Sequence, residues 1–173
     1  GTVLGGLEYL SQRVDSGTPF SVTRRDVKSA FLGYRGDFAG HGVQVNARDD
    51  HNSQFGARRT GSLGYSYRFS PEFRLRMSAG TAFKAPTFND LYFPDFPPFF
   101  FSNPNLRPER SRSREIGVNY DTERQHVSAT VFRNQITDLI FASAKTANPI
   151  TSTQVVMRMA RPVVSRVART AEA

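Results

Sequence analysis

Apolar and polar residues alternate with a period of two along most of this chain, and this pattern constrains its fold more than any other feature. Between Phe73 and Phe83, one set of alternate positions holds Phe, Leu, Met, Ala and Thr, and the other holds Arg, Ser, Gly and Ala. Successive side chains of a β-strand point to opposite faces, so the pattern predicts a strand with one apolar face. The same period recurs, sometimes more weakly, in residues 3–9, 28–36, 42–48, 62–69, 115–120 and 126–131. The sequence therefore predicts an all-β fold, an antiparallel meander of about seven long strands.

The connections between the predicted strands differ in length. Short connections at residues 37–41, 70–72 and 121–124 alternate with longer ones at about 10–26, 49–59 and 84–112. Strands of roughly 8–11 residues and this alternation of connections are typical of outer-membrane β-barrels. A soluble β-sandwich has the same side-chain alternation. Arg at repeated positions on the polar face favours the barrel, because a water-filled lumen keeps such side chains hydrated.

Composition narrows the functional classes. No apolar run approaches the ~18–20 residues of a spanning helix, which excludes a helical membrane protein. The net charge of +8 raises the hypothesis of a nucleic-acid partner. The Lys and Arg residues before Thr151, however, are spread along strand-like segments rather than gathered in one block. We therefore expect no nucleic-acid partner, and a soluble basic β domain that binds RNA is an alternative.

The sequence holds no pattern that indicates catalysis. Cysteine is absent, and the three histidines, His41, His51 and His126, fall on separate segments without metal-ligand spacing. Asp49 and Asp50 adjoin His51, but this cluster is typical of a solvated strand end. Neither a phosphate-binding glycine loop nor a nucleophile elbow occurs. We expect no enzyme activity, no metal site and no cofactor.

The longest predicted connection is rich in proline and aromatic residues. Proline lacks a backbone donor and fixes φ, so residues 86–108 cannot form an interior strand. Exposed rings on a stiff loop could stack on a bulky ligand, but packing against neighbouring loops is the favoured interpretation. Asn103-Pro104 and Pro108 predict a turn that leads back into a strand. Glu109, next to Arg107 and Arg110, can pair locally there.

Two motifs around this loop resemble the barrel signature of TonB-dependent outer-membrane receptors. They are residues 80–92 (GTAFKAPTFNDLY) and residues 103–111 (NPNLRPERS), followed by EIGV at 115–118 and ATVFRNQITDLI at 129–140. Upstream, residues 47–56 (ARDDHNSQFG) are most similar to the cobalamin-transporter branch of the family. The resemblance covers about residues 1–142 and implies an outer-membrane β-barrel.

The resemblance also implies that the chain is a C-terminal barrel fragment. The family has an N-terminal plug domain, a box that binds TonB and a barrel of 22 strands ending in an aromatic residue, and we expect none of these here. Residues 1–142 are predicted to be the partial barrel, which lacks the plug domain. Residues 143–173 depart from the family pattern and are predicted to be an atypical basic tail, frameshifted or disordered. An amphipathic membrane-binding or RNA-binding tail is the alternative for this segment.

The function implied by the resemblance is TonB-dependent uptake of a bulky nutrient across the bacterial outer membrane. The expected cargo is cobalamin or a corrinoid, and otherwise an iron chelate. Expected partners are outer-membrane lipid, this cargo and, in full-length family members, TonB. A complete eight-stranded barrel with a structural or adhesion role is the alternative, and it requires a strand from residues 138–157 that closes on the first. The candidate ligand-binding residues are Asn52, Ser53, Gln54, Thr60, Phe88 and Tyr92.

Overall fold

The structure, a computed structural model, describes residues 1–95, 97, 101–140 and 150–160. Within them lie one antiparallel sheet of eight strands and a short helix, α1 (Phe88–Tyr92). The strands are β1 (Thr2–Arg13), β2 (Arg24–Phe38), β3 (His41–Asn52), β4 (Gly56–Arg68), β5 (Phe73–Lys84), β6 (Glu109–Asp121), β7 (His126–Thr137) and β8 (Ile150–Ala160). Each strand pairs with its sequence neighbours, in the order β1 to β8, so the predicted antiparallel meander is confirmed.

An eighth strand extends the sheet beyond the seven that the sequence predicted. β8 pairs with β7 from His126↔Ala160 to Ile136↔Ile150, within the segment expected to be an atypical tail. The rest of that tail, residues 143–149 and 161–173, lies outside the described residues, so the division at residue 142 stays a prediction. β1 and β8 do not pair with each other within the described part of the chain. The closure that the small complete barrel requires is therefore missing from this sheet.

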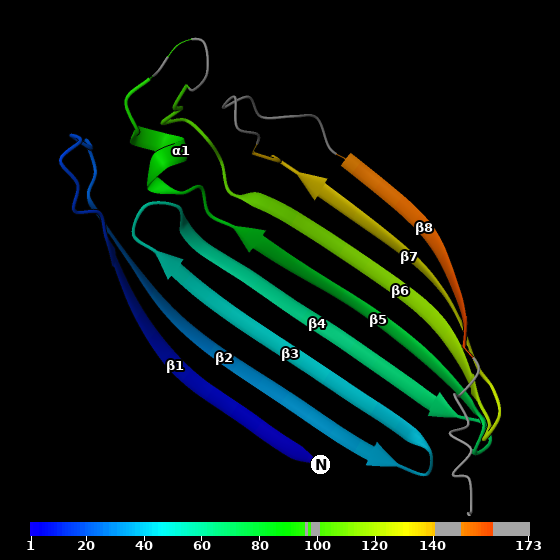
Figure 1. The fold of residues 1–173 in the computed structure, drawn as a ribbon. Helices are drawn as coiled ribbons and strands as arrows, with labels where there is room; N and C mark the ends of the chain where they lie inside the picture. Colours follow the sequence, from blue (N-terminus) through cyan, green and yellow to red (C-terminus); the bar gives the residue numbers. More distant parts are fainter. Residues whose placement is uncertain (96, 98–100, 141–149, 161–173) are drawn as a thin grey trace, which may run out of the picture.

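The two ends of the sheet differ in their connections (Figure 1). Residues 39–40, 69–72 and 122–125 form short turns at one end, and residues 14–23 and 85–108 form long loops at the other, where α1 lies. The connection predicted at residues 49–59 is much shorter than expected, because β3 continues to Asn52 and β4 begins at Gly56. The expected alternation of long and short connections therefore fails between β3 and β4.

The tightest connection joins β2 to β3 through Ala39 and Gly40. Both residues have positive φ, 46° for Ala39 and 82° for Gly40. Two successive left-handed residues give a hairpin turn whose twist matches that of the flanking strands. Ala39 adopts this conformation at an energetic cost, because its Cβ disfavours the left-handed region.

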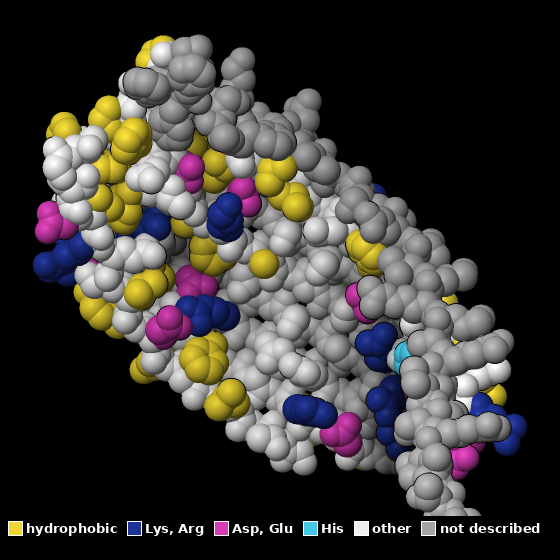
Figure 2. Space-filling model, in the orientation of Figure 1, with side chains coloured by type: hydrophobic (Ala, Val, Ile, Leu, Met, Phe, Trp, Pro, Cys, Tyr) yellow, Lys and Arg dark blue, Asp and Glu magenta, His cyan; other side chains and the backbone are white. Residues whose placement is uncertain are grey.

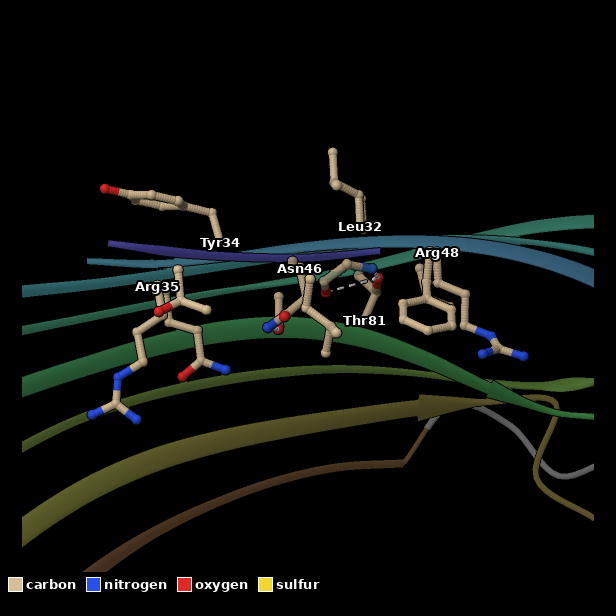
Figure 3. A pocket seen from close by; sticks show the side chains of 15 residues that line it. Leu32, Tyr34, Arg35, Asn46, Arg48 and Thr81 are labelled. Atoms are coloured by element: carbon tan, nitrogen blue, oxygen red, sulfur yellow. Dashed lines mark hydrogen bonds between the residues drawn. The ribbon is translucent and has the colours of Figure 1, made fainter. Parts of the chain in front are cut away.

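The register separates the side chains into two faces. We call the face that carries Leu32, Tyr34 and Val45 the outer face, and the face that carries Arg35 and Arg48 the inner face. Tyr34 pairs with Val45, whereas Arg35 pairs with Gln44. In Figure 3, Leu32 and Tyr34 project to one side of the sheet, and Arg35, Asn46 and Arg48 project to the other. Figure 2 shows small groups of Lys, Arg, Asp and Glu side chains scattered over the face that it views.

The sheet has no apolar core of its own among the described residues. The buried hydrophobic residues are Phe88, Leu91 and Leu106, all in the 85–108 loop. In contrast, Leu7 is 87% exposed and Val3 is 67% exposed on the outer face. Within the part of the chain that the structure describes, no helix has the length and apolar content needed to cross a lipid bilayer.

Candidate functional site

Helix α1 lies in the long loop and was not among the elements predicted from the sequence. Thr87 Oγ1 accepts a hydrogen bond from Asp90 N at 3.1 Å, and Asp90 Oδ2 accepts one from Thr87 N at 2.8 Å. This reciprocal pair is a capping box, which satisfies backbone donors at a helix start. The spacing of Thr87 and Asp90 in the sequence was the signal that could have revealed the helix. α1 buries Phe88 and Leu91 against the end of the sheet.

Arg25, at the start of β2, fastens the loop to the sheet. Its Nη1 donates to the Pro86 carbonyl oxygen at 2.8 Å, and its Nε donates to Gln12 Oε1 at 2.8 Å. Its guanidinium also lies 5.1 Å from the centroid of the Phe88 ring and 5.8 Å from that of Phe55. Such a cation–π contact is stronger where water is excluded, and Arg25 is only 6% exposed. This arginine was not among the site residues predicted from the sequence.

The turn between β3 and β4 brings three predicted site residues beside the loop. Asn52 Oδ1 accepts hydrogen bonds from Gln54 N at 2.9 Å and from Phe55 N at 3.2 Å. Ser53 Oγ accepts one from Asp26 N at 3.1 Å, which ties the turn to β2. Asn52 is 7% exposed, so its amide shapes the turn from within.

Gln54 and Tyr92 join this turn to α1. Gln54 Nε2 donates to the Tyr92 hydroxyl oxygen at 2.5 Å. Gln54 Oε1 is buried and has no hydrogen-bond partner among the described residues. A buried acceptor without a partner costs free energy, unless another molecule supplies a donor. This pair is therefore the strongest candidate for a ligand contact at the end of the sheet that carries the long loops, which we call the rim.

Thr60, the sixth predicted site residue, lies elsewhere. It belongs to β4 rather than to an outer loop, and it pairs with Arg48 on the inner face. On the inner face, Thr60 helps to line an open groove of about 720 Å³ (Figure 3). Phe31, Asn46 and Ser62 line the same groove. The structure thus brings five of the six predicted residues together around the β3–β4 turn and α1, and separates Thr60 from them.

A charged network that the sequence analysis missed lies on the inner face beside the groove. Arg48 Nη1 donates to Glu8 Oε2 at 2.9 Å, and Arg48 Nε donates to Asp50 Oδ1 at 2.8 Å. Ser29 Oγ donates to Asp50 Oδ1 at 2.5 Å and accepts from Arg48 Nη2 at 2.9 Å. These residues come from three strands, so their contact depends on register and could not be read from local spacing.

The local pairing suggested for Glu109 and the solvated strand end expected at Asp49 and Asp50 are not observed. Glu109 contacts Lys84 Nζ at 3.7 Å across the β5–β6 pair and accepts from Ile140 N at 2.8 Å, rather than pairing with Arg107 or Arg110. Asp49 and Asp50 belong to β3 and face opposite sides, because neighbouring strand residues alternate. Asp49 lies 3.5 Å from Arg59, instead of being a free solvated group. Among the described residues, no group of acidic or histidine side chains forms a metal site.

An antiparallel meander with long strands, an apolar outer face and long loops at one end has the architecture of outer-membrane β-barrels. Residues 3–165 match the family described as "TonB dependent receptor-like, beta-barrel". The chain belongs to this family, whose members are outer-membrane proteins.

Curated relatives include two vitamin B12 transporters named BtuB. The one from Photobacterium profundum is 34% identical over 145 residues, which cover 83% of this chain and 23% of the relative. The one from Vibrio vulnificus is 35% identical over 145 residues, covering 80% and 22%. The chain thus spans less than a quarter of the length of these relatives. They are transporters, in agreement with the expectation that this protein is not an enzyme.

Solved structures share the fold. The siderophore receptor PirA from Pseudomonas aeruginosa superposes with a TM-score of 0.80 at 19% identity, over 91% of this chain and 32% of that one. PirA from Acinetobacter baumannii gives a TM-score of 0.64 at 18% identity, over 92% and 29%. At this identity, the similarity supports the all-β barrel fold alone.

Proposed function

We propose that this chain is the barrel segment of a TonB-dependent transporter that imports cobalamin or a related corrinoid across the bacterial outer membrane. The observation that carries this proposal is the identity of 34% and 35% to two vitamin B12 transporters, over most of the chain. The outer face would contact lipid, and the inner face would line the aqueous path. TonB is the energy-coupling partner of the whole protein, as in the family.

The rim around Gln54 and Tyr92 is the proposed place of cargo capture. A corrinoid carries carboxamide groups around its ring. Gln54 Oε1 is buried and unpartnered in the free protein, and it could accept from a carboxamide N–H once the side chain turns outward. Tyr92 offers a hydroxyl and a ring at the same place. Ser53 lies exposed beside Gln54, so it can contact the same cargo.

The other predicted residues have different proposed roles. Asn52 and Phe88 are 7% and 9% exposed, so we assign them to holding the turn and α1 in shape. Thr60 lines the groove on the inner face, so it would meet the cargo after capture. The groove is lined by both apolar and polar residues, which suits a ligand with a flat ring and a polar periphery.

A chimeric transporter tests this proposal. Residues 3–137 would replace the matching segment of the Photobacterium profundum BtuB, in a bacterium without its own vitamin B12 uptake, and uptake of radiolabelled cyanocobalamin would be measured. We expect uptake to be retained, and the double variant Gln54→Ala, Tyr92→Phe to raise the half-saturating concentration about tenfold, as for two lost hydrogen bonds. Asn105→Ala, on the same loop, is the matched control.

The chimera separates the alternatives for the cargo. A chimera that reaches the outer membrane but takes up only ferric siderophores would assign an iron chelate instead. A chimera present in the outer membrane that takes up neither cargo would contradict the proposed function. Western blotting of outer-membrane fractions measures the amount present.

A further inference from the structure

The outer face carries a cluster of arginines that none of the contacts above uses. The cluster, which we call the basic patch, consists of Arg110, Arg112 and Arg114 of β6 and Arg133 of β7. All four are exposed. The three arginines of β6 occupy alternate positions, so they share the face of Ile116, two residues further on. Arg133 pairs directly with Arg114 across the β6–β7 register.

The basic patch lacks charge compensation within the described residues. The residues that pair with Arg110, Arg112 and Arg114 in β5 are Phe83, Thr81 and Ala79. Those that pair with Arg110 and Arg112 in β7 are Thr137 and Gln135. No ion pair among the described residues includes an arginine of the basic patch, in contrast to Arg59, which lies 3.5 Å from Asp49 on the same face.

The pairing of Arg114 with Arg133 is unfavourable on its own. Like charges directly opposite on neighbouring strands repel each other and destabilise the pair. An anion between the two guanidinium groups would remove this repulsion, and a planar guanidinium donates two parallel hydrogen bonds to a phosphate. The charge of the basic patch therefore complements a phosphate-bearing partner.

The apolar surface next to the basic patch favours one kind of phosphate-bearing partner. On the same two strands and the same face, towards the short turns, lie Ile116, Val118 and Val131, which are 46%, 46% and 43% exposed. An apolar band that continues into a cluster of cations matches a lipid, with acyl chains along the band and a charged headgroup at the arginines. A nucleic acid bound at the arginines would leave the side chains of the apolar band uncovered.

We propose that the basic patch binds phosphate-bearing lipid headgroups of the leaflet next to the long loops. This inference rests on the proposed function, because it requires the outer face to contact a membrane. Since long loops lie on the extracellular side of such barrels, this leaflet is the outer one. The basic patch then holds the loop-side ends of β6 and β7 at the headgroup region of this leaflet.

Vesicle flotation tests the inference with the full 173-residue chain. The chain is refolded from denaturant into phosphatidylcholine vesicles that contain either bis-phosphorylated lipid A or its dephosphorylated form. We expect the phosphorylated lipid to increase the floating fraction, and the variant Arg110→Gln, Arg112→Gln, Arg114→Gln to lower the apparent affinity for these vesicles at least tenfold. The corresponding Lys variant should retain most of the effect, because it keeps the charges.

The control variant removes the same number of charges from the inner face. It carries Arg68→Gln, Arg74→Gln and Arg76→Gln, and all three positions share the inner register of β4 and β5. We expect it to keep the preference for phosphorylated lipid. Equal loss in both triple variants would overturn the inference, because only net charge would then matter.

The other outcomes are also decisive. Equal flotation with phosphorylated and dephosphorylated lipid would overturn the inference and leave the membrane location of the proposed function intact. Failure to float with any vesicle would overturn the inference, whereas the proposed function would still be decided by the chimera. Loss of RNA binding in the β6 variant, without any headgroup effect, would assign the basic patch to nucleic acid instead.

Discussion

The 85–108 loop and the sheet bury apolar side chains in opposite ways. In the loop, Leu91 is 0% exposed and Leu106 is 4% exposed, packed by the protein itself. In the sheet, Leu7 is 87% exposed and Leu32 is 60% exposed. The loop therefore has a small core of its own. The apolar side chains on the outer face of the sheet, in contrast, are not covered by the described part of the chain, and lipid or detergent would have to cover them.

This difference separates two kinds of stability in one chain. Truncation of a buried side chain leaves a cavity that neither water nor the surrounding protein fills well. Truncations in the loop core should therefore destabilise the loop in water, detergent and lipid alike. A side chain on the outer face loses only its contact with detergent or lipid. Substitutions in the loop, in the sheet and in its turns test this contrast, and their expected effects differ in size.

Truncation of Leu91 should destabilise the loop more than any other single change considered. We expect Leu91→Ala to lower the free energy of loop opening by about 2–5 kcal/mol, because a fully buried leucine leaves a cavity. Hydrogen exchange of the α1 amides measures this free energy. Leu7→Ala on the outer face is the matched control and should change it little. An equal effect of both variants would refute the contrast between loop and sheet.

Removal of the Arg25 guanidinium should release the loop without unfolding the sheet. The side chain donates to the Pro86 carbonyl and stacks on Phe88, so Arg25→Ala should cost about 1.5–3 kcal/mol in loop stability. Limited proteolysis between residues 85 and 108 should become faster. Arg24→Ala, at the exposed neighbouring position, should leave the cleavage rate unchanged. Unchanged cleavage in Arg25→Ala would show that the loop core holds the loop without this contact.

The β2–β3 turn should report on the sheet alone. Gly40→Ala should destabilise the chain by about 1 kcal/mol, since Gly40 has φ 82° and an added Cβ would lie 3.2 Å from the Arg68 carbonyl oxygen. Ala39→Gly should stabilise it slightly by relieving φ 46°. Urea unfolding in detergent measures both. Gly17→Ala, in open space, is the control, and destabilisation there as large as in Gly40→Ala would contradict the explanation.

The turn between β4 and β5 should show the smallest effect. The hydrogen bond from Ser70 Oγ to Glu72 Oε2, at 2.7 Å, holds the pKa of the Glu72 carboxyl below its usual value. A lowered pKa in the folded chain stabilises it above the ordinary pKa of Glu, and this contribution is lost as the pH falls. Ser70→Ala should raise the Glu72 pKa, measured by NMR titration, whereas Ser16→Ala should not. An unshifted Glu72 titration in Ser70→Ala would assign the lowering to the turn backbone.

The sequence predicted the strands well, because alternation is a local pattern. It missed β8, where Thr151, Ser152 and Thr153 interrupt the alternation, although backbone hydrogen bonds to β7 need no such pattern. It placed Thr60 at an outer loop because the connection between the two strands was predicted to extend over residues 49–59. In the folded sheet, charged residues of this range pair across strands, as Asp49 does with Arg59.

The candidate site was predictable only in part. Gln54 and Tyr92 were predicted as site residues from the loop topology of the expected barrel, and their contact joins residues far apart in the sequence. Arg25 was not predicted, because no local pattern distinguishes a buried arginine in a strand from a solvent-exposed one. Its role depends on Pro86 and Phe88, which the long loop brings back to β2.

The unequal lengths of the connections also set the order in which the chain can assemble. The β2–β3 pair requires closure of residues 39–40 only, and the β3–β4 pair requires closure of residues 53–55. The β5–β6 pair has to close residues 85–108, which carries a larger entropic cost. We therefore expect the β2–β3–β4 hairpins to form first. β6 and β7 should join this nucleus later, once the loop between β5 and β6 has collapsed around Leu91.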